Sequence, residues 1–280
     1  MPALTSGMHV GLVAQRGNER AAALASDIRE ALHDGACRVS VDESTASALG
    51  IEGVDVPTMA DCGLVVSIGG DGTFLYAARG AAPAPILGIN LGEVGFLNAV
   101  APEDARAAVR ETVDGLRAEE ASIREVPRLV ARGPDWELEP AINEVVIQGP
   151  NRGPAGGATV SITVDGSTYS ATRADGVLVA TPTGSTAYNL REDGPLVHPD
   201  LRAMVVTEMC PAEGMPSLVV DGDREIDVEL AGADGGYVIS DGRTQHAVEP
   251  PAAVSVSLSA EPLRIAGPRV DFFAALSKLS

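Results

Sequence analysis

Residues 64–73 read Leu64-Val65-Val66-Ser67-Ile68-Gly69-Gly70-Asp71-Gly72-Thr73 and join an apolar run directly to a glycine-rich turn. The run predicts a buried strand, and Thr73–Arg79 beyond the turn has a helical pattern. Glycines allow positive φ and leave no side chain between the backbone and a ligand. The free N–H groups at the start of a helix favour an anion such as a phosphate. The stretch therefore predicts a strand, a turn and a helix, with a phosphate site at their junction.

Asp71 is a carboxylate in the middle of this predicted anion site. A carboxylate repels a phosphate unless it is compensated by a cation or accepts a proton. Phosphoryl transfer provides both, because Mg²⁺ accompanies the phosphates and a hydroxyl nucleophile must lose its proton. The alternative interpretation is a simple Asp-Gly turn between strand and helix. The motif alone leaves both interpretations open.

The first hundred residues alternate strand and helix patterns, which predicts a doubly wound parallel sheet. Strands are expected at 9–14, 38–41, 64–68 and 85–90, and helices at 18–33 and 73–79, with a further helix at 101–116. Ligands bind such sheets at the carboxyl ends of the strands, where Asp71 and Asn90 fall. Residues 1–100 are therefore expected to form an α/β nucleotide-binding domain.

The second half of the chain has an all-β pattern. A hairpin is expected from Val160 to Ser170 around Asp165-Gly166. Further strands are expected at 218–220, 225–230, 236–240 and 253–258, and an exposed loop at 149–157. This pattern predicts a β-rich, β-sandwich-like domain over residues 101–262. The tail at 263–280 is expected to return to the first domain.

The charge of the chain is strongly negative, with 39 acidic and 20 basic residues and a formal net charge of −19. Such a surface repels nucleic acid and anionic membranes, so neither is expected as a partner. The single lysine, Lys278, leaves no lysine for a Walker A loop or for the strand of a protein kinase. Acidic excess with almost no lysine resembles proteins of organisms with a salty cytoplasm. The alternative is an ordinary acidic protein from a GC-rich genome.

Targeting and cysteine patterns favour a reducing cytoplasm. No apolar run approaches the roughly 20 residues of a membrane span. The sequence starts without the basic and apolar regions of a signal peptide. Cys37, Cys62 and Cys210 form no metal-like cluster, and no metal-ligating residue is assigned.

The glycine turn resembles the signature of NAD kinases, which diacylglycerol kinases, sphingosine kinases and phosphofructokinases share more loosely. Three further blocks stand in the order in which NAD kinases have them. They are Pro85–Leu97 (PILGINLGEVGFL), Asn143–Ile147 (NEVVI) and Asp175–Tyr188 (DGVLVATPTGSTAY). The resemblance covers roughly residues 64–199, and it implies a kinase that makes NADP from NAD.

The resemblance also implies roles for particular residues. Asp71 would be the general base that deprotonates the 2′-hydroxyl of the adenosine ribose of NAD. The donor would be ATP or polyphosphate, with Mg²⁺ or another divalent cation. The NAD site would comprise Gly72, Phe96, Asn143, Glu144, Asp175, Thr183, Thr186, Ala187 and Tyr188. The donor phosphates would face Gly69, Gly70 and Thr73.

The residues themselves keep some alternatives open. Phe96 is expected either to stack on adenine or to belong to the core. Adjacent strand residues face opposite ways, so Asn143 and Glu144 both engage one ligand only at the end of a strand. The family resemblance further implies a homodimer or a homotetramer.

The sequence departs from the family pattern in two places. Arg191-Glu192-Asp193-Gly194-Pro195 stands where the family usually has a run like Ser-Ala-Gly-Gly-Pro. Arg191 either clamps a phosphate or pairs with Glu192 or Asp193. The family commonly has a Pro-His-Ser-Leu segment before an Arg-Pro, and residues 210–217 lack both this His and this Arg. These departures leave open a diverged haloarchaeal-type paralogue, a non-catalytic NAD(H)- or NADP-binding sensor, or a kinase for another diol. The choice between NAD and NADH also stays open.

Overall fold

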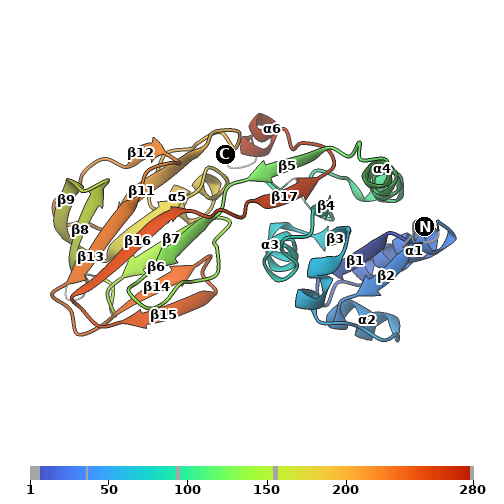
Figure 1. Cartoon of the computed structure of the whole chain (residues 1–280), viewed down its shortest axis with the longest axis horizontal. Helices are drawn as coiled ribbons and strands as arrows, with labels where there is room; N and C mark the ends of the chain where they lie inside the picture. Colours follow the sequence, from blue (N-terminus) through green and yellow to red (C-terminus); the bar gives the residue numbers. More distant parts are fainter. Residues whose placement is uncertain (1–6, 36, 93–94, 154–156, 278–280) are drawn as a thin grey trace, which may run out of the picture. The chain divides into compact units, whose positions relative to one another are not determined.

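A computed structural model of the chain describes residues 7–35, 37–92, 95–153 and 157–277. Lys278 and the first six residues lie outside this described part. The chain forms two compact units, which are labelled by element in Figure 1. One unit comprises Met1–Glu125 and Leu263–Ser280, and the other comprises Val126–Pro262.

The first unit is built on one six-stranded sheet in the order β2-β1-β3-β4-β17-β5. Its strands are β1 (His9–Ala14), β2 (Arg38–Val41), β3 (Leu64–Gly69), β4 (Ile86–Asn90), β5 (Ile123–Val126) and β17 (Leu263–Ala266). The pairs β1–β2, β1–β3, β3–β4 and β4–β17 are parallel, which confirms the predicted doubly wound parallel sheet. The tail returns to this sheet as β17, also as predicted.

Three helices of the first unit begin where a short polar side chain accepts free N–H groups. The elements are α1 (Glu19–Asp34), α2 (Glu43–Leu49), η1 (Val56–Asp61), α3 (Asp71–Gly80), η2 (Pro102–Asp104), α4 (Ala105–Arg117) and α6 (Phe272–Leu276). Asn18 caps α1 and Asp42 caps α2 through side-chain oxygens that accept backbone N–H groups. In α1, Ala21, Ala25 and Ile28 turn one apolar face towards the core that this helix shares with α4, β1 and β3.

The boundary between the units lies after Glu125, whereas the sequence places it near residue 100. The difference arises because α4 packs Val109 and Val113 into the core of the first unit. The following strand, β5, then joins the first sheet beside β17. The sequence predicts the helix correctly, but it does not reveal which core the apolar face of the helix joins.

The second unit is a β-sandwich, which confirms the predicted fold class. One sheet has the order β12-β11-β10-β7-β14-β15 and the other β6-β16-β13-β8-β9. The first sheet contains β7 (Glu144–Gln148), β10 (Gly176–Ala180), β11 (Ala203–Met209), β12 (Leu218–Asp221), β14 (Gly236–Ser240) and β15 (Thr244–Val248). The second contains β6 (Leu129–Arg132), β8 (Ala158–Val164), β9 (Ser167–Ala174), β13 (Ile226–Ala231) and β16 (Ala252–Leu258). Side chains from both sheets, such as Ile147 and Val228, share one core.

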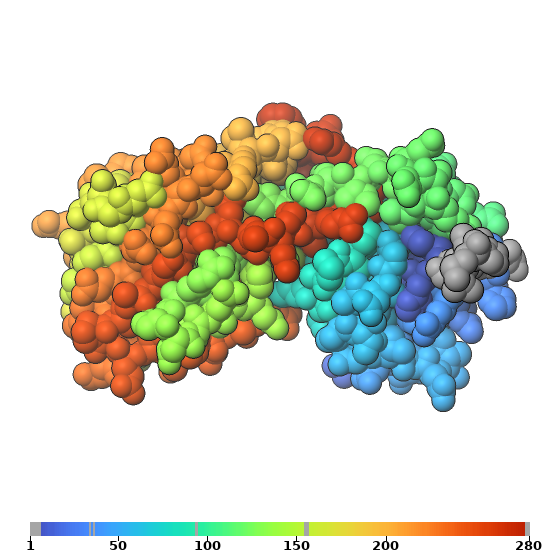
Figure 2. Space-filling model, viewed as in Figure 1, coloured from blue at the N-terminus to red at the C-terminus, as the bar shows by residue number. Residues whose placement is uncertain are grey.

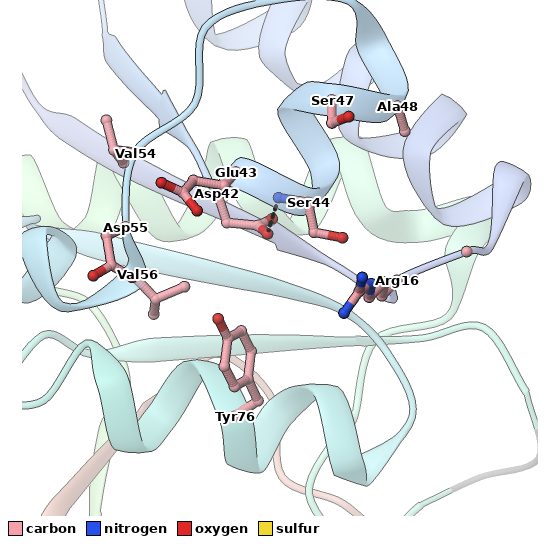
Figure 3. Close-up of a pocket in the computed structure, with 11 residues that line it drawn as sticks. Arg16, Asp42, Glu43, Ser44, Ser47, Ala48, Val54, Asp55, Val56 and Tyr76 are labelled. Atoms are coloured by element: carbon pink, nitrogen blue, oxygen red, sulfur yellow. Dashed lines mark hydrogen bonds between the residues drawn. The ribbon is translucent and has the colours of Figure 1, made fainter.

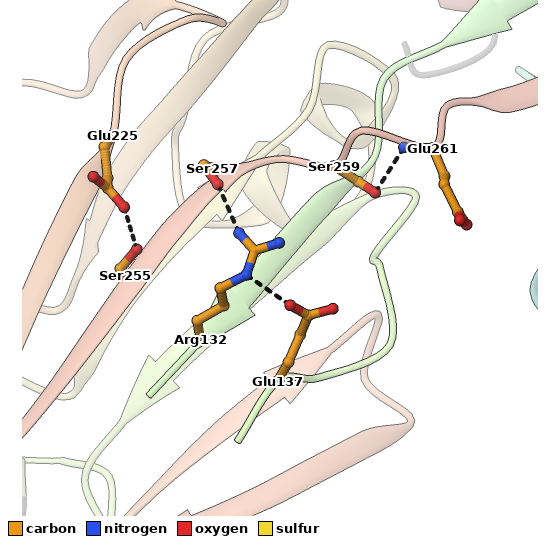
Figure 4. A network of polar contacts seen from close by, with 7 residues as sticks. All are labelled: Arg132, Glu137, Glu225, Ser255, Ser257, Ser259 and Glu261. Carbon is orange, nitrogen blue, oxygen red and sulfur yellow. Dashed lines mark hydrogen bonds and ion pairs between the residues drawn. The ribbon is translucent and has the colours of Figure 1, made fainter. Parts of the chain in front are cut away.

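The outer face of the second sheet is polar. On β16 the buried residues Val254 and Val256 alternate with Ser255 and Ser257, as expected for a strand with one solvated face. Arg132 on the neighbouring strand β6 donates to Ser257 and to Glu137 within the polar network of Figure 4. Strands β6 and β16 pair side by side and lie on the visible surface in Figure 2.

Strands β10 and β11, which were not predicted from the sequence, are almost entirely buried, so their sequences lack an alternation of apolar and polar residues. Leu178 and Val205 face a second core on the outside of the first sheet. Tyr188, at the start of the short helix α5 (Tyr188–Arg191), packs against this core. The one-turn helix η3 (Thr183–Thr186) precedes α5. Within the described residues, no helix combines the length and apolar character needed to cross a membrane.

Candidate functional site

The glycine turn lies at the carboxyl end of β3, and α3 begins at Asp71, two residues earlier than predicted. None of Gly69, Gly70 and Gly72 has a positive φ, so this turn does not require the left-handed backbone conformation that favours glycine. Gly69 is required by close packing, because a Cβ there would lie 2.5 Å from Thr73 Oγ1. A Cβ at Gly70 or Gly72 would meet no atom within 4 Å. These two glycines therefore expose bare backbone beside a helix start that has no side-chain cap.

Asp71 is held by the segment that follows β4. Its Oδ2 accepts the backbone N–H of Phe96 at 2.9 Å. Its Oδ1 accepts the N–H of Leu97 at 3.3 Å and Asn98 Nδ2 at 3.2 Å. The carboxylate is thus fixed in orientation by three donors from outside its own turn, which a simple Asp-Gly turn does not require.

Two glycines make room for this arrangement. A Cβ at Gly95 would lie 2.7 Å from Asp71 Cγ, and a Cβ at Gly88 would lie 3.0 Å from Asn98 Cγ. Asn98 is itself buried, with 1% of its surface exposed. Gly88, Gly95 and Asn98 were not identified as site residues from the sequence. The spacing of glycines in Pro85–Leu97 is the signal that indicates Gly88 and Gly95.

Phe96 is half-buried rather than part of the apolar core. Its ring centroid lies 6.2 Å from that of Phe272 in α6, with the planes inclined at 58°. Phe273, which is 71% exposed, packs edge-on against Phe272 at 5.6 Å. The tail thus brings the ring of Phe272 to the candidate adenine-stacking residue, and Phe273 packs against Phe272.

Asn143 and Glu144 lie at the end of a strand, because β7 begins at Glu144. Asp241, in the turn between β14 and β15, accepts the N–H groups of Ile142 at 2.9 Å, Asn143 at 2.7 Å and Glu144 at 3.2 Å. Its own N–H donates to the carbonyl of Glu144 at 2.9 Å. Sequence reasoning missed Asp241, and the Asp-Gly pair at 241–242 signals only the turn.

The segment after β10 packs directly against Asn143. Thr181 N–H donates to the carbonyl of Asn143 at 2.8 Å, and a Cβ at Gly184 would lie 2.7 Å from Asn143 Cα. Thr186 Oγ1 donates to the carbonyl of Thr183 at 3.1 Å. The N–H of Ala187 donates to the carbonyl of Gly184 at 2.9 Å. The structure therefore brings the predicted residues Thr183, Thr186 and Ala187 together with Asn143 in the second unit.

Asp175 and Tyr188 meet the same loop. The N–H of Gly153 donates to Asp175 Oδ1 at 2.8 Å. Arg152, which the sequence analysis did not single out, donates to the hydroxyl of Tyr188 at 3.0 Å, with its guanidinium carbon 5.9 Å from the ring centroid. Burial is the main cause that raises the pKa of Tyr188, and a hydrogen bond with Glu192 adds to it. Arg152 opposes this shift. Residues 150–152 are exposed as predicted, Gly149 and Gly157 are buried, and 154–156 lie outside the described residues.

Arg191 is exposed at the end of α5. Arg191, Glu192 and Asp193 all belong to the described part of the chain, and no ion pair joins Arg191 to either neighbouring carboxylate. The structure therefore does not contain the pairing that was one of the two interpretations of Arg191. Gly194 in the same run is fixed by packing, because a Cβ there would lie 2.5 Å from Asn189 Nδ2.

The predicted site residues thus form two groups, one in each unit. The first unit contains Gly69, Gly70, Asp71, Gly72, Thr73 and Phe96, and the second contains Asn143, Glu144, Asp175, Thr183, Thr186, Ala187 and Tyr188. Over the ranges that the structure describes, no group of three or more His, Cys, Asp or Glu side chains is arranged to hold a metal ion.

Comparison with known proteins gives matches to two family models. The ATP-NAD kinase N-terminal domain matches residues 10–116, and the ATP-NAD kinase C-terminal domain matches residues 142–267. Together these ranges include every predicted site residue.

Individual relatives match over nearly the whole chain. The NAD kinase of Halobacterium salinarum is 58% identical over 97% of this chain and 100% of its own length. The NAD kinase of Haloarcula marismortui is 56% identical over 98% of this chain and 100% of its own. A solved structure of an Archaeoglobus fulgidus NAD kinase in complex with ATP aligns with a TM-score of 0.78 at 25% identity, covering 97% of this chain and 98% of that one. The chain belongs to the NAD kinase family.

Proposed function

We propose that the chain transfers the γ-phosphate of ATP to the 2′-hydroxyl of the adenosine ribose of NAD, giving NADP and ADP. As a member of the NAD kinase family, the chain is a kinase that phosphorylates NAD. The assignment of ATP as donor draws on the Archaeoglobus fulgidus relative, which was solved with ATP. The observation that carries the choice of residues is the oriented carboxylate of Asp71 beside two bare glycines.

Asp71 acts in this proposal as the general base. A carboxylate offers about four acceptor sites, and three are engaged by Phe96, Leu97 and Asn98. Oδ2 has one of these donors and retains capacity to accept the 2′-hydroxyl of NAD. The proton passes to Asp71 as the ribose oxygen bonds to the γ-phosphorus, and the bond to the bridging oxygen breaks with its electron pair leaving on ADP.

The glycine turn binds the donor phosphates. Gly70 and Gly72 allow a phosphate to approach the backbone, and the N-terminus of α3 attracts negative charge. Thr73 adds a hydroxyl at this end. The carboxylate of Asp71 would be the protein ligand for a divalent cation that arrives with the phosphates, since Mg²⁺ typically takes one or two protein carboxylates and fills its shell with phosphate oxygens and water. Such a cation neutralises charge on the transferring phosphate.

The second unit supplies the residues that bind NAD. Asn143 and Glu144 offer an amide and a carboxylate at the end of β7, which suit the hydroxyls of a ribose. Asp175, Thr183 and Thr186 add polar atoms, while Tyr188 provides a ring face and Ala187 a small side chain. In the first unit, Phe96 stacks on adenine. In the second unit, Arg191, which forms no ion pair with Glu192 or Asp193, contacts a phosphate of the dinucleotide.

The assembly and location follow from the family resemblance and the composition. We expect a homodimer or homotetramer in the cytoplasm, bound to small nucleotides and to neither nucleic acid nor membrane. Light scattering coupled to gel filtration at molar KCl distinguishes these assemblies from a monomer.

The test is NADP formation from NAD and ATP with Mg²⁺ at molar KCl, compared between the native chain and Asp71→Asn. We expect the variant to lose 10²- to 10⁴-fold in kcat, about the contribution of a general base. Parallel assays with polyphosphate and with NADH identify the preferred donor and acceptor.

Asn98→Ala is the matched control for this test. An Asn at 71 presents an amide N–H₂ to donors on 96–98, so Asp71→Asn weakens the anchoring of this segment as well as removing the base. Asn98→Ala removes one of the same hydrogen bonds and keeps the carboxylate. Equal losses of kcat in the two variants contradict the role of base and leave Asp71 as an anchor only.

A further inference from the structure

A cavity of about 580 Å³ lies in the first unit and contains none of the predicted site residues. Figure 3 shows its lining, which comes from the segments after β1 and β2, the approach to η1, and α3. The cavity therefore lies at the carboxyl ends of β1 and β2, where doubly wound sheets bind ligands. Its volume is within the range of small-molecule sites.

The cavity adjoins the glycine turn. Gln15, which immediately precedes the cavity residue Arg16, has its Cβ 3.0 Å from the position of a Cβ on Gly69. On α3, the cavity residue Tyr76 follows Thr73 by three positions, so both side chains lie on the same face of the helix. A ligand that begins at the glycine turn can thus extend along α3 into the cavity.

The lining combines an aromatic ring with acceptors for hydroxyl groups. Tyr76 is 51% exposed and projects towards the cavity (Figure 3). Glu43 and Asp55 are exposed carboxylates on the same cavity. Asp42 is already engaged, since it accepts the N–H groups of Ser44 at 3.0 Å and Thr45 at 3.3 Å as the cap of α2. Glu43 and Asp55 are therefore the carboxylates available to a ligand.

The charges favour a neutral group inside the cavity and an anionic group at its rim. Burial and the carboxylates of Asp42, Asp55 and Glu43 raise the pKa of Tyr76, so its hydroxyl stays protonated at neutral pH. These carboxylates disfavour phosphate beside the ring. Arg16, the residue after Gln15, is exposed at the edge of the cavity (Figure 3). Its guanidinium offers the cationic partner that a phosphate chain needs.

We propose that this cavity holds the nucleoside part of the phosphate donor, an inference that rests on the proposed kinase function. The base stacks on the ring of Tyr76, and the ribose hydroxyls donate to Glu43 or Asp55. Arg16 contacts the phosphate chain, which extends to the backbone at 70–73. The chain therefore prefers a nucleoside triphosphate over an inorganic polyphosphate as donor.

The test compares ATP with inorganic tripolyphosphate by calorimetry at molar KCl, in the native chain, Tyr76→Ala and Tyr76→Phe. Tyr76→Ala removes the ring on which the base stacks, so it should weaken ATP binding about tenfold or more. Tyr76→Phe should retain it, because the ring remains. The affinities for tripolyphosphate and for NAD should not change in either variant. Equal weakening of ATP and tripolyphosphate, unchanged ATP affinity, or a loss confined to NAD overturns the proposal.

A second pair of variants tests the carboxylates by turnover. Glu43→Gln should raise the KM for ATP several-fold and leave the KM for NAD unchanged, whereas Glu52→Gln, which removes an exposed carboxylate outside the cavity, should change neither. Equal KM values in both variants contradict the assigned role of Glu43. If the native chain makes no NADP at all, the proposed function fails, while the calorimetric comparison still decides whether the cavity binds the nucleoside.

Discussion

At the scale of single residues, the candidate catalytic centre depends on the absence of a side chain at Gly95. Asp71 occupies space beside Gly95 that any larger residue would take, since a Cβ at 95 would lie 2.7 Å from Asp71 Cγ. Gly92 belongs to the same loop, but a Cβ there would meet only Asn90 Oδ1, at 4.0 Å. Neither glycine has a positive φ, so the two positions differ in packing rather than in backbone strain.

This difference predicts opposite outcomes for two alanine substitutions. Gly95→Ala should displace the carboxylate of Asp71 and lower kcat at least tenfold, because a general base misplaced by about 1 Å loses much of its effect. Gly92→Ala should stay within about twofold of the native rate. Steady-state kinetics with NAD and ATP measure both, and equal rates in the two variants contradict the placement of Asp71.

At the scale of elements, two β-hairpins share one turn chemistry but differ in what the turn holds. Asp165 and Asp241 both have a φ of 48° and both precede a glycine with positive φ, as tight hairpin turns require. Asp165 is exposed and accepts Arg224 and the N–H of Glu225. Asp241 instead holds the three N–H groups at the start of β7, beside the predicted NAD-binding pair.

Asp241 is therefore expected to position Asn143 and Glu144. Asp241→Asn turns an amide N–H₂ towards backbone donors, which leaves a donor unsatisfied at a cost of about 1–3 kcal/mol. The KM for NAD should rise about tenfold or more, while the KM for ATP stays unchanged. Asp165→Asn is the matched control, and it should leave both KM values unchanged. A similar rise in both variants would mean that any loosened hairpin turn affects NAD binding.

At the scale of the whole molecule, a net charge of −19 dominates the electrostatics. The described ion pairs do little to offset it, because pairs such as Arg202–Asp223 and Arg132–Glu137 are largely exposed. Exposed pairs contribute roughly 0–1 kcal/mol and are screened by salt. Repulsion among the excess carboxylates is therefore the main long-range term, and it opposes the compact state.

Salt should consequently stabilise the chain. The screening length falls from about 10 Å at 0.1 M to about 3 Å at 1 M, which removes repulsion between carboxylates that are not in contact. The melting temperature should rise steadily from low to molar KCl, as followed by circular dichroism. The same titration with an uncharged osmolyte at equal osmolality separates screening from exclusion effects. A melting temperature that is independent of KCl contradicts this account of the charge.

The sequence by itself determined the elements whose signals are local. Asn18 marks the start of α1, Asp165-Gly166 marks the hairpin of β8 and β9, and the apolar run before Gly69 marks β3. Each signal works because a cap, a turn or an apolar period acts over a few residues. The family motifs likewise identified most candidate site residues, since they are short contiguous runs.

Only the tertiary structure decided which distant residues act on those motifs. Asp71 is anchored from 25–27 positions away, and Asp241 reaches residues 97–99 positions away. Nothing local encodes these contacts, because they depend on the order in which strands pair. For the same reason, the sequence did not reveal that α4 packs into the first core. The cavity beside Tyr76 was not predicted either, because its lining comes from four separate segments that only the sheet brings together.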